Sequence, residues 1–124
     1  MEPTRKVMIL DDNLMDVMEV EEHLTAGGYT VTALSSPNGA LSKIEYEQPE
    51  ILLLDLEMER LNVSDLLHSL RSAPEYDELV IVLFSEREAE FLQEFCIQHD
   101  INGYYCKSMD ITQIAAFLDN FYEY

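Results

Sequence analysis

Short apolar runs, each followed by a segment of helical periodicity, recur along the whole chain. The runs occupy residues 7–10, 30–34, 51–54, 80–84 and 103–106. Strands that are apolar throughout are typical of parallel sheets covered on both faces. Right-handed crossovers place helices on both sides of such a sheet. The pattern predicts a doubly wound (βα)5 α/β sandwich of three layers, and the less apolar runs 30–34 and 103–106 are expected at its edges.

The segments between the runs carry apolar residues at helical spacing. Gly27 and Gly28 stop the first predicted helix, and Asp110 is the expected N-cap of the last. Ser36 and Pro37 predict the N-cap and first position of the second helix. The five apolar faces are Val17, Val20 and Leu24; Ala40, Leu41 and Ile44; Val63, Leu66, Leu67 and Leu70; Ala89, Leu92, Phe95, Cys96 and His99; and Ile111, Ile114, Ala115, Leu118 and Tyr122. These repeats fill residues 1–124, which we expect to form a single domain.

The charge of the chain narrows the choice of partner. Its 25 Asp and Glu against 7 Lys and Arg give a formal net charge of −18, shared equally between residues 1–62 and 63–124. No basic stripe is present to neutralise phosphates, so nucleic acid is excluded as a partner. An anionic membrane surface would repel the chain, and no apolar run approaches the length that spans a bilayer.

A cytoplasmic location is expected from the ends and the cysteines of the chain. The first residues lack the apolar core of a signal peptide. Cys96 and Cys106 suggest neither a disulfide scaffold nor a zinc cluster, and each is expected to be a small buried side chain. His23, His68 and His99 do not cluster with other candidate residues, so none is expected to be a ligand or a phosphocarrier.

Polar residues follow four of the five predicted strands. Asp11 and Asp12 follow the first, Asp55 the third, Ser85 the fourth and Lys107 the fifth. Taken singly, each is more often a turn former, a cap or a surface charge. Sites in open parallel sheets form beyond the carboxyl ends of the strands, so together these residues predict one site. Three carboxylates at one edge repel one another, and a bound Mg²⁺ would offset that repulsion.

These residues make the chain resemble the receiver domain of bacterial two-component response regulators, in particular the stand-alone chemotaxis type. The resemblance covers essentially the whole chain. It rests on the acidic pair after Leu10, on Asp55 between Leu54 and Leu56, on Ser85 after Phe84, and on Lys107 after Cys106. It implies a flavodoxin-like fold whose five parallel strands lie in the order 2-1-3-4-5.

The resemblance also implies a phosphorelay function. Asp55 would accept a phosphoryl group from a phosphohistidine of a sensor histidine kinase or phosphotransfer protein. Asp12, Asp55 and the backbone carbonyl of Glu57 would ligate Mg²⁺, with Asp11 in support. Lys107 would neutralise the phosphoryl group. The domain would catalyse at most its own phosphorylation and dephosphorylation, so it would not be an enzyme in the ordinary sense.

A switch is implied as well. Ser85 would donate a hydrogen bond to the phosphoryl group, and its inward movement would make room for the ring of Tyr104. In the family this pair carries the signal to the face made by the fourth helix, fifth strand and fifth helix. That face would contact a downstream effector protein, and it would be the surface of any homodimer. The plain alternative for Tyr104 is a half-exposed aromatic on an edge strand.

Four positions depart from the family pattern. Glu59, Val63 and Ser108 stand where proline, glycine and proline are usual, so the loop after the third strand and the backbone at Lys107 are expected to differ. Glu86 replaces a small residue beside Ser85. We hypothesise a gate in which Arg87 pairs with Glu57 or Glu86 and narrows the entrance, so that small phosphodonors react slowly.

Other functions remain open at this point. A degenerate receiver would have the same fold but act as an unphosphorylated interaction module. A phosphatase-like hydrolase using Asp55 and Glu57 is less favoured, because such enzymes carry that motif on their first strand. A flavin site lacks a phosphate-binding run of Ser, Thr and Gly. The acids Glu86, Glu88, Glu90 and Glu94 form either a solvated face of the fourth helix or a surface for a basic partner.

Overall fold

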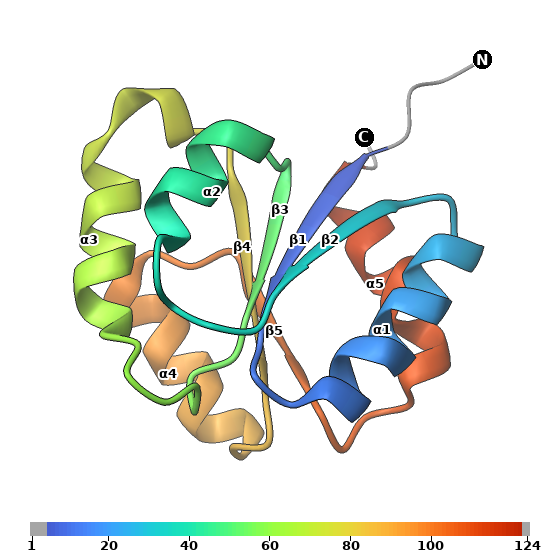
Figure 1. The fold of residues 1–124 in the computed structure, drawn as a ribbon. Helices are drawn as coiled ribbons and strands as arrows, with labels where there is room; N and C mark the ends of the chain where they lie inside the picture. Colours follow the sequence, from blue (N-terminus) through green and yellow to red (C-terminus); the bar gives the residue numbers. More distant parts are fainter. Residues whose placement is uncertain (1–4, 123–124) are drawn as a thin grey trace.

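Five parallel strands form one sheet in the computed structural model, which describes residues 5–122 (Figure 1). Their order is β2-β1-β3-β4-β5, so both the predicted fold and the two predicted edge strands are confirmed. The strands are β1 (Lys6–Leu10), β2 (Thr30–Leu34), β3 (Ile51–Leu54), β4 (Val80–Ser85) and β5 (Gly103–Cys106). Leu10 pairs with Leu54, and Leu54 with Leu83, so neighbouring strands end almost level.

Five α-helices cover the sheet in two outer layers. Figure 1 shows α1 and α5 on one face and α2, α3 and α4 on the other. The helices are α1 (Leu14–Ala26), α2 (Ala40–Glu47), α3 (Val63–Ser72), α4 (Ala89–His99) and α5 (Ile114–Asp119), with short 3-10 turns at Pro74–Tyr76, Ile111–Gln113 and Asn120–Tyr122. No helix among the described residues is long and apolar enough to cross a membrane.

Each central strand is buried on both faces, as its unbroken apolar sequence predicts. In β1, Met8 and Leu10 pack on the side of α2, α3 and α4, whereas Val7 and Ile9 pack on the side of α1 and α5. Burial of such a side chain contributes roughly 1.5–3 kcal/mol. The sheet is therefore a stiff platform, and the residues that follow its strands inherit fixed positions.

Two expectations about α2 are wrong. The helix begins at Ala40 and not at Pro37, because Gly39 adopts a left-handed conformation with φ of +72° directly before it. Ser36 instead accepts a hydrogen bond from the Asn38 amide at 3.2 Å and so caps a turn. Leu41 is 43% exposed, since α2 turns only Ala40 and Ile44 into the core.

Other helix features follow the sequence more closely. Helix α1 ends at Ala26 with Gly27 as its C-cap. A Cβ at Gly27 would lie 2.5 Å from the Cβ of Ala115, so glycine allows α1 and α5 to touch there. Asp110 is a cap as predicted, but it caps the 3-10 turn before α5. In α4, Ala89 is exposed, contrary to its predicted place on the apolar face.

Candidate functional site

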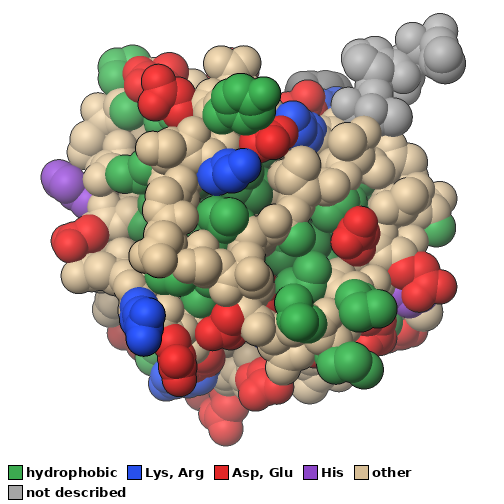
Figure 2. Space-filling view, viewed as in Figure 1, with side chains coloured by type: hydrophobic (Ala, Val, Ile, Leu, Met, Phe, Trp, Pro, Cys, Tyr) green, Lys and Arg blue, Asp and Glu red, His purple; other side chains and the backbone are tan. Residues whose placement is uncertain are grey.

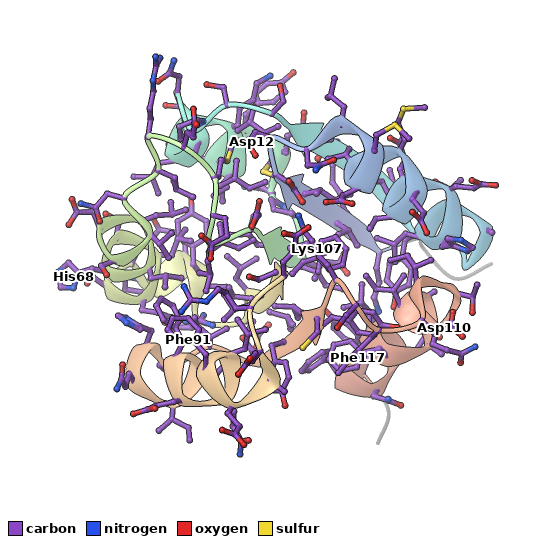
Figure 3. All side chains as sticks on the ribbon, turned by 90° about the horizontal axis from the view of Figure 1, so that it is seen from below. Asp12, His68, Phe91, Lys107, Asp110 and Phe117 are labelled. Atoms are coloured by element: carbon purple, nitrogen blue, oxygen red, sulfur yellow. The ribbon has the colours of Figure 1, made fainter. Side chains whose placement is uncertain are left out.

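The carboxyl ends of four strands bring the predicted site residues together. Asp11 directly follows β1, Asp55 follows β3, Ser85 ends β4 and Lys107 follows β5. The last hydrogen bonds of the sheet fix the two aspartates, because the Asp11 amide donates to Leu34 O at 3.2 Å and the Asp55 amide donates to Leu10 O at 3.0 Å. Figure 3 views this end of the sheet, with Asp12 and Lys107 near its centre. Figure 2 shows acidic side chains gathered at the same, lower edge of the molecule.

Three carboxylates form the centre of the site. Asp11 and Asp55 are buried, with 1% and 4% of their surface exposed, whereas Asp12 is exposed. One oxygen of each carboxylate lies within 4.8 Å of the others. Backbone amides hold the buried pair in place, since Asn13 N donates to Asp11 Oδ1 at 2.9 Å and Glu57 N donates to Asp55 Oδ1 at 3.0 Å. Such a spacing suits oxygen ligands that share one small hard cation.

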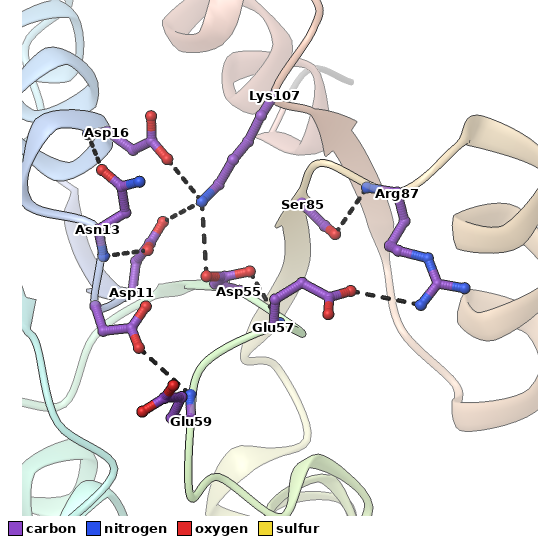
Figure 4. A network of polar contacts seen from close by, with 10 residues as sticks. Asp11, Asn13, Asp16, Asp55, Glu57, Glu59, Ser85, Arg87 and Lys107 are labelled. Carbon is purple, nitrogen blue, oxygen red and sulfur yellow. Dashed lines mark hydrogen bonds and ion pairs between the residues drawn. The ribbon is translucent and has the colours of Figure 1, made fainter.

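Lys107 is the cation of the cluster. Its Nζ lies 2.9 Å from Asp11 Oδ2, 2.9 Å from Asp16 Oδ2 and 3.6 Å from Asp55 Oδ2 (Figure 4). Its side chain is only 9% exposed. The Lys107 amide donates to Ser85 O at 2.7 Å, which continues the pairing of β4 and β5 to the edge of the site. The contact to Asp11 Oδ2 is an ion pair without good hydrogen-bond geometry, so this buried oxygen keeps unused acceptor capacity.

Burial and charge act in opposite ways on Asp55 and Lys107. Burial is the largest cause that raises the pKa of Asp55 to about 6, and the Asp11 charge adds to it, against the Glu57 amide and Lys107. Burial alone would lower the pKa of Lys107. Its close contacts with Asp16 and Asp11 and the charge of Asp55 outweigh burial and raise that pKa. The site therefore holds a firmly charged ammonium beside a carboxylate that is reluctant to ionise.

Arg87 and Glu57 lie together at the mouth of the site. Arg87 Nη1 is 3.5 Å from Glu57 Oε1, and the guanidinium stacks 3.7 Å from the ring centre of Phe91. The Arg87 amide donates to Ser85 Oγ at 3.1 Å. Of the two partners expected for Arg87, the structure places Glu57 beside it, while Glu86 is an exposed residue. Both members of the ion pair are about half exposed, so a ligand can displace the pair at small cost.

Comparison with known proteins decides the family. The sequence model of the response regulator receiver domain matches residues 7–119. The chain belongs to the receiver domain family. Receiver domains are signalling modules of two-component systems. The five residues on which the resemblance rests, Asp11, Asp12, Asp55, Ser85 and Lys107, follow or end strands at one edge of the sheet.

Individual relatives agree with this assignment. An uncharacterized response regulatory protein of Staphylococcus epidermidis is 32% identical over 117 residues, which are 92% of this chain and 45% of that protein. The chain thus spans less than half the length of this curated relative. Among solved structures, the chemotaxis response regulator CheY4 of Vibrio cholerae superimposes with a TM-score of 0.84 at 17% identity, covering 95% of this chain and 98% of that one.

A second similar structure is that of a phosphorylated response regulator. The phosphorylated cyanobacterial phytochrome response regulator RcpA superimposes with a TM-score of 0.76 at 20% identity, covering 96% of this chain and 91% of that one. At such identities the likeness of both structures shows the fold alone.

The loop after β3 shows how this receiver accommodates its unusual residues. Its left-handed residue is Arg60, with φ of +65°. Val63, at the position where glycine is usual, is instead the first residue of α3 and is capped by Asn62, whose Oδ1 accepts a hydrogen bond from the Asp65 amide at 3.0 Å. Val63 is not among the residues with positive φ, so valine meets no backbone strain there.

Tyr104 and Tyr105 face opposite sides of the sheet. Tyr104 is half-buried and packs against the core beneath α3 and α4. Tyr105 is buried on the side of α5, where its ring meets Phe117 edge-on at 5.2 Å and its hydroxyl donates to the Asp110 carbonyl. Tyr104 is therefore the aromatic residue of β5 that shares a layer with α4, as the switch hypothesis requires.

Sequence reasoning missed Asp16. Its Oδ2 is as close to Lys107 Nζ as Asp11 is, although the two residues are 91 positions apart. The signal that was available is local: Asn13 caps α1, so an acid three residues later belongs to the first helical turn. Its direction toward Lys107 depends on how α1 packs on the sheet.

The histidines, by contrast, lie on helices away from this cluster, and none contacts it.

Proposed function

We propose that Asp55 is phosphorylated by a phosphohistidine of a sensor kinase or phosphotransfer protein. An oxygen of the Asp55 carboxylate attacks phosphorus, the new O–P bond forms, the P–N bond of the donor breaks, and the imidazole leaves. The observation that supports this most directly is the position of Asp55. It is a buried carboxylate at a strand end, with Oδ1 held by the Glu57 amide and Oδ2 3.6 Å from Lys107 Nζ.

The residues present fit a magnesium ion. The Asp11, Asp12 and Asp55 carboxylates offer oxygens within 4.8 Å of one another, and the buried Asp11 Oδ2 accepts no hydrogen bond of good geometry. We propose that Asp12, Asp55 and the carbonyl of Glu57 hold Mg²⁺, with Asp11 in support. A bound Mg²⁺ would supply the positive charge that lets a phosphoryl group approach these carboxylates.

Ser85 and Lys107 would bind the phosphoryl oxygens. Ser85 Oγ accepts a hydrogen bond from the Arg87 amide at 3.1 Å, which leaves its O–H free to donate. Lys107 lies on the other side of Asp55 and would pair with a second oxygen (Figure 4). Movement of Ser85 toward the phosphoryl group would couple to Tyr104, and so to the face formed by α4, β5 and α5. That face would bind an effector protein or a second copy of the chain.

Glu57, Glu86 and Arg87 would restrict entry to the site. The Glu57–Arg87 pair lies beside Asp55, and Glu86 adds a negative charge next to Ser85. A small anionic donor must pass these carboxylates, whereas a protein donor can open the pair with its own contacts. Reaction with acetyl phosphate would therefore be slow compared with transfer from a cognate phosphohistidine.

The second candidate is an unphosphorylated receiver that binds a partner constitutively. The carboxylates of Glu57 and Glu86 favour it, because they repel an incoming phosphoryl group, and the Glu57–Arg87 pair narrows the entrance. In either case residues 1–124 would act as one receiver domain. The net charge of −18 favours protein partners with a basic surface and disfavours nucleic acid.

One experiment separates the two candidates. The protein is incubated with Mg²⁺ and beryllofluoride, whose BeF₃⁻ adduct mimics an aspartyl phosphate, and binding is followed by fluorine NMR. We expect a bound signal that disappears in Asp55→Asn and persists in Asp77→Asn, an exposed aspartate distant from the site. A base-labile phosphoryl adduct from a phosphohistidine donor should show the same dependence. Wild-type protein without either adduct would favour the constitutive module.

A further inference from the structure

Lys107 has a third acid within its reach, Asp16, that the phosphorylation chemistry does not require. Asp16 Oδ2 lies 2.9 Å from Nζ, closer than the Asp55 oxygen at 3.6 Å. We propose that Asp16 is a positioning residue that holds the Lys107 ammonium away from Asp55 and thereby weakens binding of the phosphoryl group. The inference rests on the proposed phosphorylation of Asp55.

Both partners of this contact are anchored by the fold. The Asp16 amide donates to Asn13 Oδ1 at 3.1 Å, which ties it into the capped first turn of α1. At that helix end a carboxylate is also favoured by the macrodipole. The Lys107 amide is held by Ser85 O, and the two side chains are 9% and 28% exposed. The contact thus differs from the pairing of two mobile surface chains, which stabilises little.

The hydrogen-bonding capacity of Lys107 gives the reason for competition. An ammonium group has three N–H donors. Asp11, Asp16 and Asp55 already surround Nζ at 2.9, 2.9 and 3.6 Å. Of the three, only the Asp16 contact has hydrogen-bond geometry, so Asp16 fixes the direction of Nζ. A phosphoryl oxygen that draws Nζ toward Asp55 therefore competes with Asp16. Asp11 is 1% exposed and would be left without a counter-charge, so Asp16, the most exposed of the three, is the one that must give way.

The charge of the site leads to the same result. Asp11, Asp12 and Asp55 would be balanced by Lys107 together with a bound Mg²⁺. Asp16 adds one further negative charge to that balance. The phosphoryl group brings about two more. Removing the Asp16 charge should therefore favour the phosphorylated state over the free one.

The test compares Asp16→Asn with wild type for affinity toward beryllofluoride at saturating Mg²⁺. We expect Asp16→Asn to bind about tenfold more tightly, because it frees one ammonium donor and removes one charge near the ligand. Asp16→Glu, which keeps the charge, should return toward wild type. Glu19→Gln removes an exposed acid of the same helix that is not among the carboxylates within 4 Å of Lys107, and it should leave the affinity unchanged.

A second measurement needs no phosphoryl mimic. In metal-free protein at fixed pH, the ¹⁵Nζ signal of Lys107 should shift in Asp16→Asn and stay in place in Glu19→Gln. Equal beryllofluoride affinity in wild type and Asp16→Asn would overturn the inference alone. Absence of binding in every variant would overturn the proposed function as well. Binding that first appears in Asp16→Asn would support both in their strongest form.

Discussion

The two ends of the sheet handle charge in different ways. At the amino end, Lys6 at the start of β1 pairs with Glu47, and Arg5 pairs with Glu50 at 3.2 Å, with side chains that are about 40–50% exposed in the second pair. Among the residues that the structure describes, each of these two cations pairs with one carboxylate. At the carboxyl end, Lys107 is 9% exposed and shared by three carboxylates. The first arrangement balances its own charge, whereas the second does not.

The difference separates charges that folding tolerates from charges that need a ligand. Exposed one-to-one pairs contribute little to stability in either direction. Buried acids that outnumber the nearby cations lower the stability of the folded protein. Such groups are typical of functional sites, where a bound ligand offsets their repulsion. The carboxyl end of the sheet is therefore the place where a cation or a phosphoryl group changes the energy of the protein most.

Loss of the single cation should have the largest effect. Replacement of Lys107 by Met should lower the free energy of unfolding by about 3–5 kcal/mol in metal-free protein near neutral pH, because it leaves buried carboxylates without a partner. Lys6→Met, the matched change at the amino end, should cost less than about 1 kcal/mol. Urea unfolding measures both. Equal losses at the two ends would break the comparison.

Neutralising Asp55 should instead raise the free energy of unfolding. The pKa of Asp55 is raised from 3.8 to about 6, so the folded protein holds this proton more tightly than the unfolded chain. Its contribution to stability is present below pH 4 and is lost as the pH rises through about 6. Above pH 6, Asp55→Asn should therefore be more stable than wild type by about 2–3 kcal/mol, at 1.36 kcal/mol per pKa unit.

Unfolding curves at pH 4 and pH 7 test this sign. The gain of Asp55→Asn should be small at pH 4 and full at pH 7. Glu50→Gln at the amino end serves as the control and should change stability by less than about 1 kcal/mol at pH 7. If Asp55→Asn were no more stable than wild type at pH 7, burial and the Asp11 charge would not destabilise the ionised Asp55 carboxylate.

Magnesium should stabilise the folded protein through the carboxylates at the carboxyl end of the sheet and not through those at the amino end. At ten times its dissociation constant, Mg²⁺ should raise the free energy of unfolding of wild type by about 1.4 kcal/mol through binding to the folded state. Asp12→Asn should lose this gain, and Glu47→Gln should keep it. Thermal melts with NaCl at matched ionic strength remove general screening. A gain that is equal in both variants would place the ion elsewhere.

The smallest change in stability is expected for the exposed pair at the mouth of the site. Arg87→Ala should alter the free energy of unfolding by less than about 0.5 kcal/mol, as should Arg5→Ala at the amino end. Arg87→Ala, unlike Arg5→Ala, should speed phosphorylation by acetyl phosphate, because it opens the Glu57–Arg87 pair at the entrance to the site. Glu86→Ala should speed it too, and an unchanged rate in that variant would refute the gate.

Much of the fold was predictable because local and long-range preferences agree in it. The unbroken apolar runs require burial on both faces and so identified the three central strands, whereas the less apolar runs 30–34 and 103–106 identified the two edges. The start of α2 was missed because Ser36 and Pro37 form a good helix start by themselves. The left-handed turn at Gly39 overrides them. Leu41 was misplaced because α2 packs on the sheet through Ala40 and Ile44, which are four residues apart, and Leu41 lies outside that narrow face.

The site was predictable only where it depends on strand ends. Asp11, Asp55, Ser85 and Lys107 follow their strands directly, so a parallel sheet brings them together whatever the loops do. Asp16 belongs to a helix, and its position depends on how α1 packs. The pairing of Arg87 with Glu57 depends on the path of two loops. No periodicity in the sequence encodes such distances.

The glycine at the end of α1 brings this helix into close contact with α5. Helix α1 has 13 residues and is about 20 Å long. Asp16 lies in its first turn, and Gly27 sits just past its last, against Ala115 of α5. Because glycine has no side chain, the backbone of α1 lies directly against the methyl group of Ala115 at that point. Any tilt of α1 that follows the release of Asp16 from Lys107 would therefore also shift α5 at the Gly27–Ala115 contact, at the opposite end of α1 from Asp16.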